Sequence, residues 1–394
     1  MFDQLLEPLS AWAETGTLLQ TIKTEKGAVL GQGVGRTSSI LLLALLWREQ
    51  NRKMLIVTGT PSAAEHLTSD LSLLVGEDHC LLFPAYDLLA HEEAYEKEVA
   101  GQRLSVLGKL LTKEKMVVVT SWPALVRKVL PPKELGGFFL SVGVGNELER
   151  DRFLRQLVTM GYNRVTKVET AGEFSVRGDI VDLYPLDQPD PFRIEFFGDE
   201  VDSIRTFDPE TQKSVAKLKK ILILPAREGL WTAEQFRTAK PMIDIFLNQQ
   251  CARLRKTNIG ERMEEAAVFL KKRYGELLEK AANGLVFPGM DRFLPLVRND
   301  LVPFWAYMPD ALFILHEPIR GSEYLRSLEE ENNRMFGGFI ERGLVLPEET
   351  GLYLSFNEIQ AFLAQHAKVY LSTLNRTLKG SKVTSTIGFP MRLA

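Results

Sequence analysis

Short apolar runs alternate with amphipathic segments along roughly the first 130 residues. The runs are rich in Val, Ile and Leu, which is typical of buried strands, whereas the segments between them place apolar residues at helical spacing. Strands are predicted at 54–58, 80–86 and 116–122, and helices at 37–50, 61–75 and 101–115. Short strands separated by helices of about ten or more residues indicate a parallel α/β sheet.

The pattern changes after Pro131 and Pro132, where alternating strands and turns replace the helices. A helix is predicted at 147–160, and the residues after it, up to about 225, consist mostly of strands. The pair Gly198-Asp199 separates two alternating runs and predicts a tight strand–turn–strand connection. We therefore expect a small α+β domain inserted into the α/β domain.

The α/β pattern returns in the last third of the chain. Residues 232–282 are rich in charge pairs at helical spacing and are interpreted as a solvated helical segment. A buried strand follows at 311–317, and residues 351–373 indicate a strand, a helix and a second strand. The predicted fold class is therefore α/β with an inserted α+β domain.

Composition excludes several classes of protein. The 394 residues are 45% hydrophobic and 25% charged, with a net charge of −3, which is typical of a globular cytoplasmic protein and not of a strongly basic nucleic-acid-binding protein. The longest apolar run, 40–47, is too short to cross a membrane. The two cysteines, Cys80 and Cys251, lie far apart and the five histidines are scattered, so neither a disulfide nor a metal site is expected.

A glycine-rich turn at 29–39, "VLGQGVGRTSS", resembles the nucleotide-binding P-loop G-x-x-x-x-G-K-[ST]. With Gly35, Arg36 and Thr37 aligned on the end of that motif, Leu30 occupies the first glycine position and Gly31 comes one place late. Arginine in place of lysine keeps the charge but changes its reach and donor geometry. Thr37 retains a hydroxyl suited to Mg²⁺. The dinucleotide motif G-x-G-x-x-G does not fit, because the glycines fall at 31, 33 and 35.

A P-loop works with a buried strand that ends in Asp-Glu, where the aspartate orders Mg²⁺. The best candidate, 311–317, ends in His316 and Glu317, and a neutral imidazole is a poor ligand for Mg²⁺. Two damaged motifs in the right order predict a P-loop-derived scaffold that does not hydrolyse ATP and has no catalytic residue. Active hydrolysis and an unrelated glycine-rich turn are the alternatives.

The strands at 172–212 carry an unusual face. Alternate residues of a strand point the same way. One face of 192–197 carries Phe192, Ile194 and Phe196, and the other carries Arg193, Glu195 and Phe197. If the preceding strand pairs with this one, Arg177 joins the second face, and an aromatic residue with arginines is typical of a protein–protein contact. The alternative is an ordinary solvated face with cross-strand ion pairs and with Phe197 packed beneath the insertion.

Residues 177–179 form the tripeptide Arg-Gly-Asp, which also occurs in cell-adhesion motifs. In this chain its occurrence is interpreted as chance.

Three segments of this region, "GEFSVRGDIVDLYP", "FRIEFFGDEVDSIRTFDPETQKS" and "ILILPARE", resemble the module shared by UvrB and the transcription-repair coupling factors (Mfd). The resemblance extends from about residue 25 to the end of the chain. The coupling factors fit better, because UvrB has an intact P-loop and Asp-Glu pair. UvrB also has a long aromatic hairpin. At that place this chain has only the short acidic connection 87–102, in which Tyr95 is the one aromatic residue.

The resemblance implies a domain organisation. A RecA-like α/β domain with a degenerate P-loop comprises residues 1–130 and 225–350, and an α+β domain that binds UvrA is inserted at 131–224. Residues 351–394 begin a further domain or form a carboxy-terminal segment. The binding positions of the family fall on Arg177, Arg193 and Phe197, the three residues that strand alternation groups together.

The implied function is that of a non-catalytic adaptor, without a cofactor, that recruits UvrA to stalled transcription complexes. RNA polymerase and DNA are bound in this family by domains that do not fit in 394 residues, so the chain is interpreted as an amino-terminal fragment, with a short natural homologue as the alternative. A UvrB-like DNA-dependent ATPase is the competing function. Direct DNA binding through Lys217, Lys219 and Lys220 is a third hypothesis, against which a solvated edge is favoured.

Overall fold

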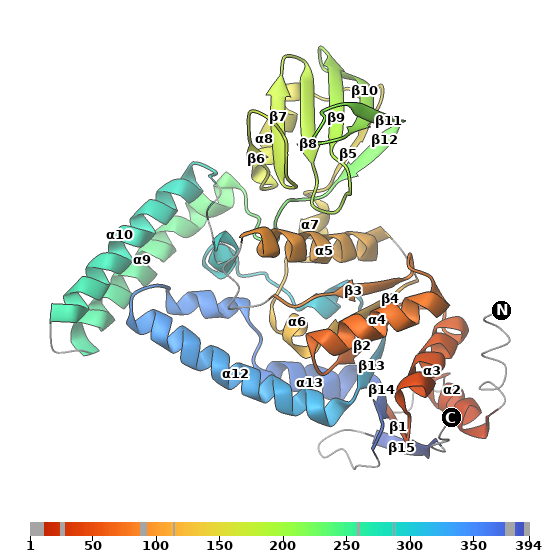
Figure 1. Ribbon diagram of the computed structural model, residues 1–394. Helices are drawn as coiled ribbons and strands as arrows, with labels where there is room; N and C mark the ends of the chain where they lie inside the picture. Colours follow the sequence, from red (N-terminus) through yellow and green to blue (C-terminus); the bar gives the residue numbers. More distant parts are fainter. Residues whose placement is uncertain are drawn as a thin grey trace.

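The structure is a computed structural model that describes residues 12–23, 28–86, 93–112, 115–257, 261–285, 287, 289–374 and 383–389. Its larger part is built on a seven-stranded sheet with the strand order β15-β1-β14-β13-β2-β4-β3, in which all neighbours are parallel (Figure 1). The strands are β1 (Ala28–Gln32), β2 (Met54–Thr58), β3 (Cys80–Phe83), β4 (Val117–Ser121), β13 (Leu312–His316), β14 (Ala367–Ser372) and β15 (Val383–Gly388). The predicted α/β class is confirmed.

Helices cover both faces of this sheet (Figure 1). One face is covered by α2 (Ala13–Lys23), α3 (Arg36–Glu49) and α4 (Pro61–Val75). The other is covered by α5 (Glu93–Thr112), α6 (Trp122–Val126), α12 (Pro318–Glu341) and α13 (Phe356–His366). Neighbouring residues of β2 point to opposite faces: Ile56 packs in the core beneath α2, α3 and α4, and Leu55 packs in the core beneath α5, α6, α12 and α13. Because both faces are buried, the strands read as unbroken apolar runs.

The small domain is an antiparallel sheet packed on one helix. Its six-stranded sheet has the order β11-β10-β9-β8-β7-β6, antiparallel throughout except for the short pair of β6 and β7. The strands are β6 (Asn163–Arg164), β7 (Glu173–Arg177), β8 (Ile180–Tyr184), β9 (Phe192–Phe197), β10 (Glu200–Phe207) and β11 (Ser214–Leu218). A second, two-stranded sheet joins β5 (Leu140–Gly143) to β12 (Lys220–Ile223). The chain enters this domain through α7 (Pro132–Gly136).

The helix α8 (Arg150–Thr159) covers the apolar face of the small sheet, with the rings of Phe153 and Phe196 6.0 Å apart. The predicted turn between β9 and β10 is present, and Gly198 there has φ +63°, which a residue with a Cβ rarely adopts. The helix predicted at 147–160 is α8, shortened at its start.

The segment predicted to be a solvated helix is two long helices, α9 (Ala233–Thr257) and α10 (Glu261–Ala282), and each buries one side. Leu247 and Leu254 of α9 and Leu270 and Tyr274 of α10 belong to the core of the large domain. The prediction is therefore wrong for that side, since the charge pairs mark only the outer surface. The short helices η1 (Met290–Phe293), α11 (Leu294–Val297), η2 (Phe304–Tyr307) and η3 (Pro347–Leu352) complete the packing.

The described part of 351–394 belongs to the large domain. It contributes α13 and the strands β14 and β15, which lie on either side of β1. The sequence left open whether 351–394 begins a further domain or forms a carboxy-terminal segment. Both strands pair with residues of β1 more than 300 positions away, a pairing that leaves no local signal in the sequence. The first six residues of the acidic connection 87–102 and the side chain of Tyr95 lie outside the described residues. None of the described helices is long and apolar enough to span a membrane.

Two glycines of α12 provide a matched test of this packing. A Cβ added to Gly321 would lie 1.8 Å from Nε1 of Trp122, whereas one added to Gly337 would meet nothing within 4 Å. We expect Gly321→Ala to lower the free energy of unfolding by about 1–3 kcal/mol through overpacking. We expect Gly337→Ala to raise it by up to about 1 kcal/mol, because alanine is the better helix former. Urea unfolding followed by tryptophan fluorescence measures both, and equal effects would contradict the packing of α12 on α6.

Candidate functional site

The solvent-facing side of the small sheet carries the residues that the sequence grouped together. In the register of the sheet, Arg193 of β9 lies opposite Asp182 of β8, and Glu195 lies opposite Ile180. Since cross-strand partners point the same way, Arg177, Arg193 and Phe197 share one face, as alternation predicted. We call this surface the polar face and define it by Arg177, Asp182, Arg193, Glu195, Phe197 and Arg205.

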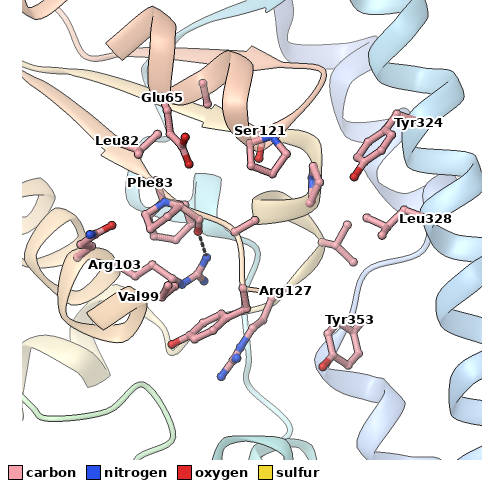
Figure 2. Close-up of a pocket in the computed structure, with 18 of the residues that line it drawn as sticks. Glu65, Leu82, Phe83, Val99, Arg103, Ser121, Arg127, Tyr324, Leu328 and Tyr353 are labelled. Atoms are coloured by element: carbon pink, nitrogen blue, oxygen red, sulfur yellow. Dashed lines mark hydrogen bonds between the residues drawn. The ribbon is translucent and has the colours of Figure 1, made fainter. Parts of the chain in front are cut away.

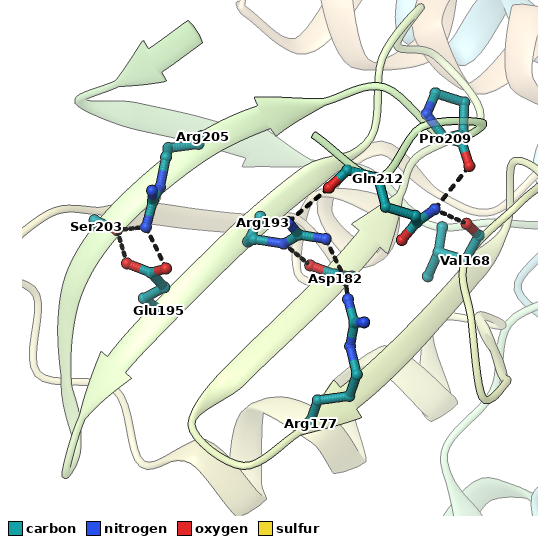
Figure 3. A network of polar contacts seen from close by, with 9 residues as sticks. All are labelled: Val168, Arg177, Asp182, Arg193, Glu195, Ser203, Arg205, Pro209 and Gln212. Atoms are coloured by element: carbon teal, nitrogen blue, oxygen red, sulfur yellow. Dashed lines mark hydrogen bonds and ion pairs between the residues drawn. The ribbon is translucent and has the colours of Figure 1, made fainter. Parts of the chain in front are cut away.

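The centre of the polar face is the carboxylate of Asp182, whose side chain is fully buried. Arg193 donates from Nε to Oδ1 at 2.7 Å and from Nη2 to Oδ2 at 3.0 Å, and Arg177 donates from Nη2 to Oδ2 at 2.5 Å (Figure 3). The hydrogen bond to Asp182 raises the pKa of Arg193. Asp182 is not among the predicted residues, because alternation gives the face on which a residue lies but not its burial.

Arg193 also holds the turn that follows β10. Its Nη1 donates to the backbone oxygen of Gln212 at 3.1 Å (Figure 3), and its guanidinium lies over the ring of Phe207, 4.5 Å from the centroid. Gln212 has φ +61°, and its amide donates to the backbone oxygens of Pro209 at 2.7 Å and Val168 at 3.2 Å. The arginine therefore joins the sheet to this turn.

A second ion pair lies beside the first one on the polar face. Arg205 pairs with Glu195, and the hydroxyl of Ser203 donates to Glu195 at 2.6 Å (Figure 3). The Ser203 hydrogen bond is the main cause that lowers the pKa of Glu195. The cross-strand ion pairs of the solvated-face alternative are thus present.

Exposure distinguishes the three predicted residues. Phe197 is 81% exposed, so it is not packed beneath the insertion. The side chain of Arg177 is 51% exposed and that of Arg193 only 13%. Phe197 and Arg177 are available to a partner, whereas Arg193 is mostly engaged within the domain. Lys217, Lys219 and Lys220 are exposed along the edge formed by β11 and β12.

The degenerate P-loop lies between β1 and α3. Gly33 has φ +75°, and Gly35 precedes the first residue of α3 in an extended conformation. The N–H of Val34 donates to the backbone oxygen of Ser372 at 3.2 Å. Arg36, whose side chain is 71% exposed, is bonded to Asp70 of α4 at 2.9 Å, and Thr37 is exposed.

His316 and Glu317 lie at the end of β13, and β14 lies between that strand and β1. Burial lowers the pKa of His316, which favours the neutral imidazole. Glu317 has φ +52°, and its Oε1 accepts a hydrogen bond from the N–H of Thr373 at 2.7 Å. The carboxylate that would orient water in an ATPase is thus bonded to the backbone. Within the described ranges, no three His, Cys, Asp or Glu side chains cluster as metal ligands.

A cavity of about 580 Å³ opens at the carboxyl ends of β3 and β4 (Figure 2). Two arginines line it, and each is paired: Arg103 with Glu228 at 2.5 Å and Arg127 with Asp291 at 2.6 Å. The guanidinium of Arg127 also lies 4.2 Å from the ring centroid of Tyr86. Because both cations are neutralised within the protein, the cavity is poorly suited to a phosphate. The sequence contained no signal for it, since each pair joins distant segments.

Comparison with known proteins connects these features to a family. Residues 140–228 match the UvrB interaction domain model. The chain is 31% identical over 332 residues to the transcription-repair-coupling factor of Bacillus subtilis, a match that covers 84% of this chain and 27% of that protein. It is 36% identical over 334 residues to the one of Myxococcus xanthus, covering 81% and 26%. For Haemophilus influenzae the identity is 28% over 343 residues, covering 86% and 27%.

The chain spans about a quarter of the length of these relatives. The matched domain, 140–228, includes the whole polar face and the strands that carry it. The predicted resemblance is therefore confirmed. Over 81–86% of its length the chain is similar to transcription-repair-coupling factors, and its residues 140–228 match the UvrB interaction domain model.

Proposed function

We propose that this chain is a non-catalytic adaptor module that binds the repair protein UvrA and so recruits it to stalled transcription complexes. The observation that carries the proposal is the exposure of Phe197 and Arg177 on one face of a UvrB interaction domain. A large aromatic side chain that is 81% exposed and shares its face with arginines has the composition that is typical of the centre of a protein–protein contact. Contacts to RNA polymerase and DNA are proposed for portions of the whole factor that this chain does not span.

The chemistry of the polar face indicates what the partner presents. Three arginines and two carboxylates leave one net positive charge on it, and Arg177 keeps N–H donors beyond the one that Asp182 accepts. Carboxylates or carbonyl groups on UvrA would accept charge-assisted hydrogen bonds from Arg177. An apolar pocket beside them would cover Phe197, since aromatic and arginine side chains are the usual anchors of such contacts.

The proposal includes the absence of ATP hydrolysis by this chain. In a working P-loop the loop N–H groups and the basic residue hold the phosphates. Here the N–H of Val34 is bonded to Ser372, and Arg36 is bonded to Asp70. One carboxylate oxygen of Glu317 already accepts a hydrogen bond from the N–H of Thr373. These contacts support a scaffold role for the large domain.

Truncation of the exposed residues tests the docking role. Phe197→Ala and Arg177→Ala should each weaken binding to purified UvrA by about 1–3 kcal/mol, because each removes an anchor of the contact. Isothermal titration calorimetry measures the dissociation constants. Leu73→Ala is the matched control, since Leu73 is also an exposed apolar residue, at 68%, but lies on α4 of the large domain. Unchanged affinity in both variants would reject the site.

A second test concerns the nucleotide. Phosphate release with ATP, measured with and without DNA, should not exceed that of a sample lacking the protein. Arg36→Ala should leave this background unchanged, because Arg36 is bonded to Asp70 and not directed at a phosphate. Turnover that Arg36→Ala abolishes would instead establish a UvrB-like ATPase.

A further inference from the structure

The carboxylate of Asp182 connects the residues of the polar face that lie on three different strands. It lies on β8, between β7, which carries Arg177, and β9, which carries Arg193. Its two oxygens accept three hydrogen bonds from these two guanidinium groups (Figure 3). An ionised carboxylate without exposed surface must be compensated by opposite charge, so the two arginines are held to it strongly.

The two arginines differ in what they offer to a partner. Arg193 uses Nε, Nη1 and Nη2 inside the domain and is 13% exposed, whereas Arg177 uses one N–H and is 51% exposed. Within the part of the chain that the structure describes, Asp182 is the one hydrogen-bond partner shown for the guanidinium of Arg177. The position of this guanidinium therefore depends on Asp182, and Asp182 is in turn held by Arg193.

We propose that Asp182 is a positioning residue of the UvrA-docking face, which fixes the guanidinium of Arg177 in its binding geometry and is itself held in place by Arg193. This rests on the proposed function. A long arginine side chain loses considerable rotamer freedom when a partner immobilises it, and an arginine fixed beforehand loses less. Asp182 acts through Arg177, and it does so without exposed surface of its own.

A double-mutant cycle separates positioning from a general structural effect. Asp182→Asn keeps the size of the side chain but removes its charge, so UvrA should bind about tenfold more weakly. In a chain that already carries Arg177→Ala, the same change should alter the affinity less than about twofold, because the residue it positions is gone. Equal losses in both backgrounds would overturn the proposal. Asp151→Asn is the matched control, since Asp151 is 69% exposed and lies on α8, across the sheet.

A second readout does not need UvrA. Phenylglyoxal modifies accessible guanidinium groups, and peptide mass spectrometry gives the rate for each arginine. Arg177 should react several-fold faster in Asp182→Asn than in the parent chain, and an unchanged rate would overturn the proposal. If the parent chain does not bind UvrA, the proposed function fails, and this rate still decides whether Asp182 holds Arg177.

A third variant covers the case in which Asp182→Asn does not fold, as judged by circular dichroism. Arg177→Lys leaves Asp182 intact and keeps the positive charge, but replaces the planar guanidinium with a compact ammonium. If fixed guanidinium geometry matters, Arg177→Lys should lose UvrA affinity nearly as much as Arg177→Ala. If the lysine variant binds like the parent, charge alone suffices and positioning by Asp182 is rejected.

Discussion

The buried ion pair of Arg103 and Glu228 joins helix α5 of the large domain to the segment by which the chain leaves the small domain. Arg103 of α5 has no exposed side-chain surface, and Glu228 lies just beyond β12, where the chain leaves the small domain. The arginine also donates to the backbone oxygen of Pro84 at 2.9 Å and lies over the ring of Phe83. Removal of one partner from such a pair typically costs about 3–5 kcal/mol. Two residues earlier on α5, a Cβ on Gly101 would lie 2.7 Å from the backbone oxygen of Leu186, so α5 also contacts the small domain directly. Buried contacts therefore set the relative placement of the two domains.

Asp182 applies the same constraint within the small domain. Both sites contain a carboxylate out of water that arginines compensate, and both differ from exposed pairs such as Lys240 and Asp244, which contribute only a few tenths of a kcal/mol. A surface pair can break and reform at little cost, whereas a buried carboxylate keeps its partners in place. The polar face is thus organised before any partner arrives, which lowers the ordering cost of binding. This is why a face full of internal ion pairs is compatible with a docking role.

Local patterns predicted the parts of the fold that depend on neighbouring residues. Alternation placed Arg177, Arg193 and Phe197 on one face, since the period of a strand is a local property. The same pattern could not show that Asp182 is buried, because its burial depends on pairing among three strands. Likewise, β14 and β15 could not be assigned to the large sheet, since parallel strands pair across long separations without a turn signal. The charge pairs of α9 and α10 indicated their solvated side and hid the side that packs on the core.

The loop after β1 has the form of a P-loop, and two of the groups that a nucleotide site would use are bonded within the protein. The end of β14 supplies the partners: Ser372 accepts from Val34, and Thr373 donates to Glu317. A Cβ on Gly31 would lie 3.1 Å from side-chain atoms of Leu371 and Phe389, so close packing maintains this glycine independently of any phosphate. The helix α3 is anchored by a row of fully buried leucines that needs no ligand. The stability of the scaffold is therefore separable from nucleotide chemistry. That separation is the physical condition under which arginine can stand at the lysine position while the domain keeps its fold.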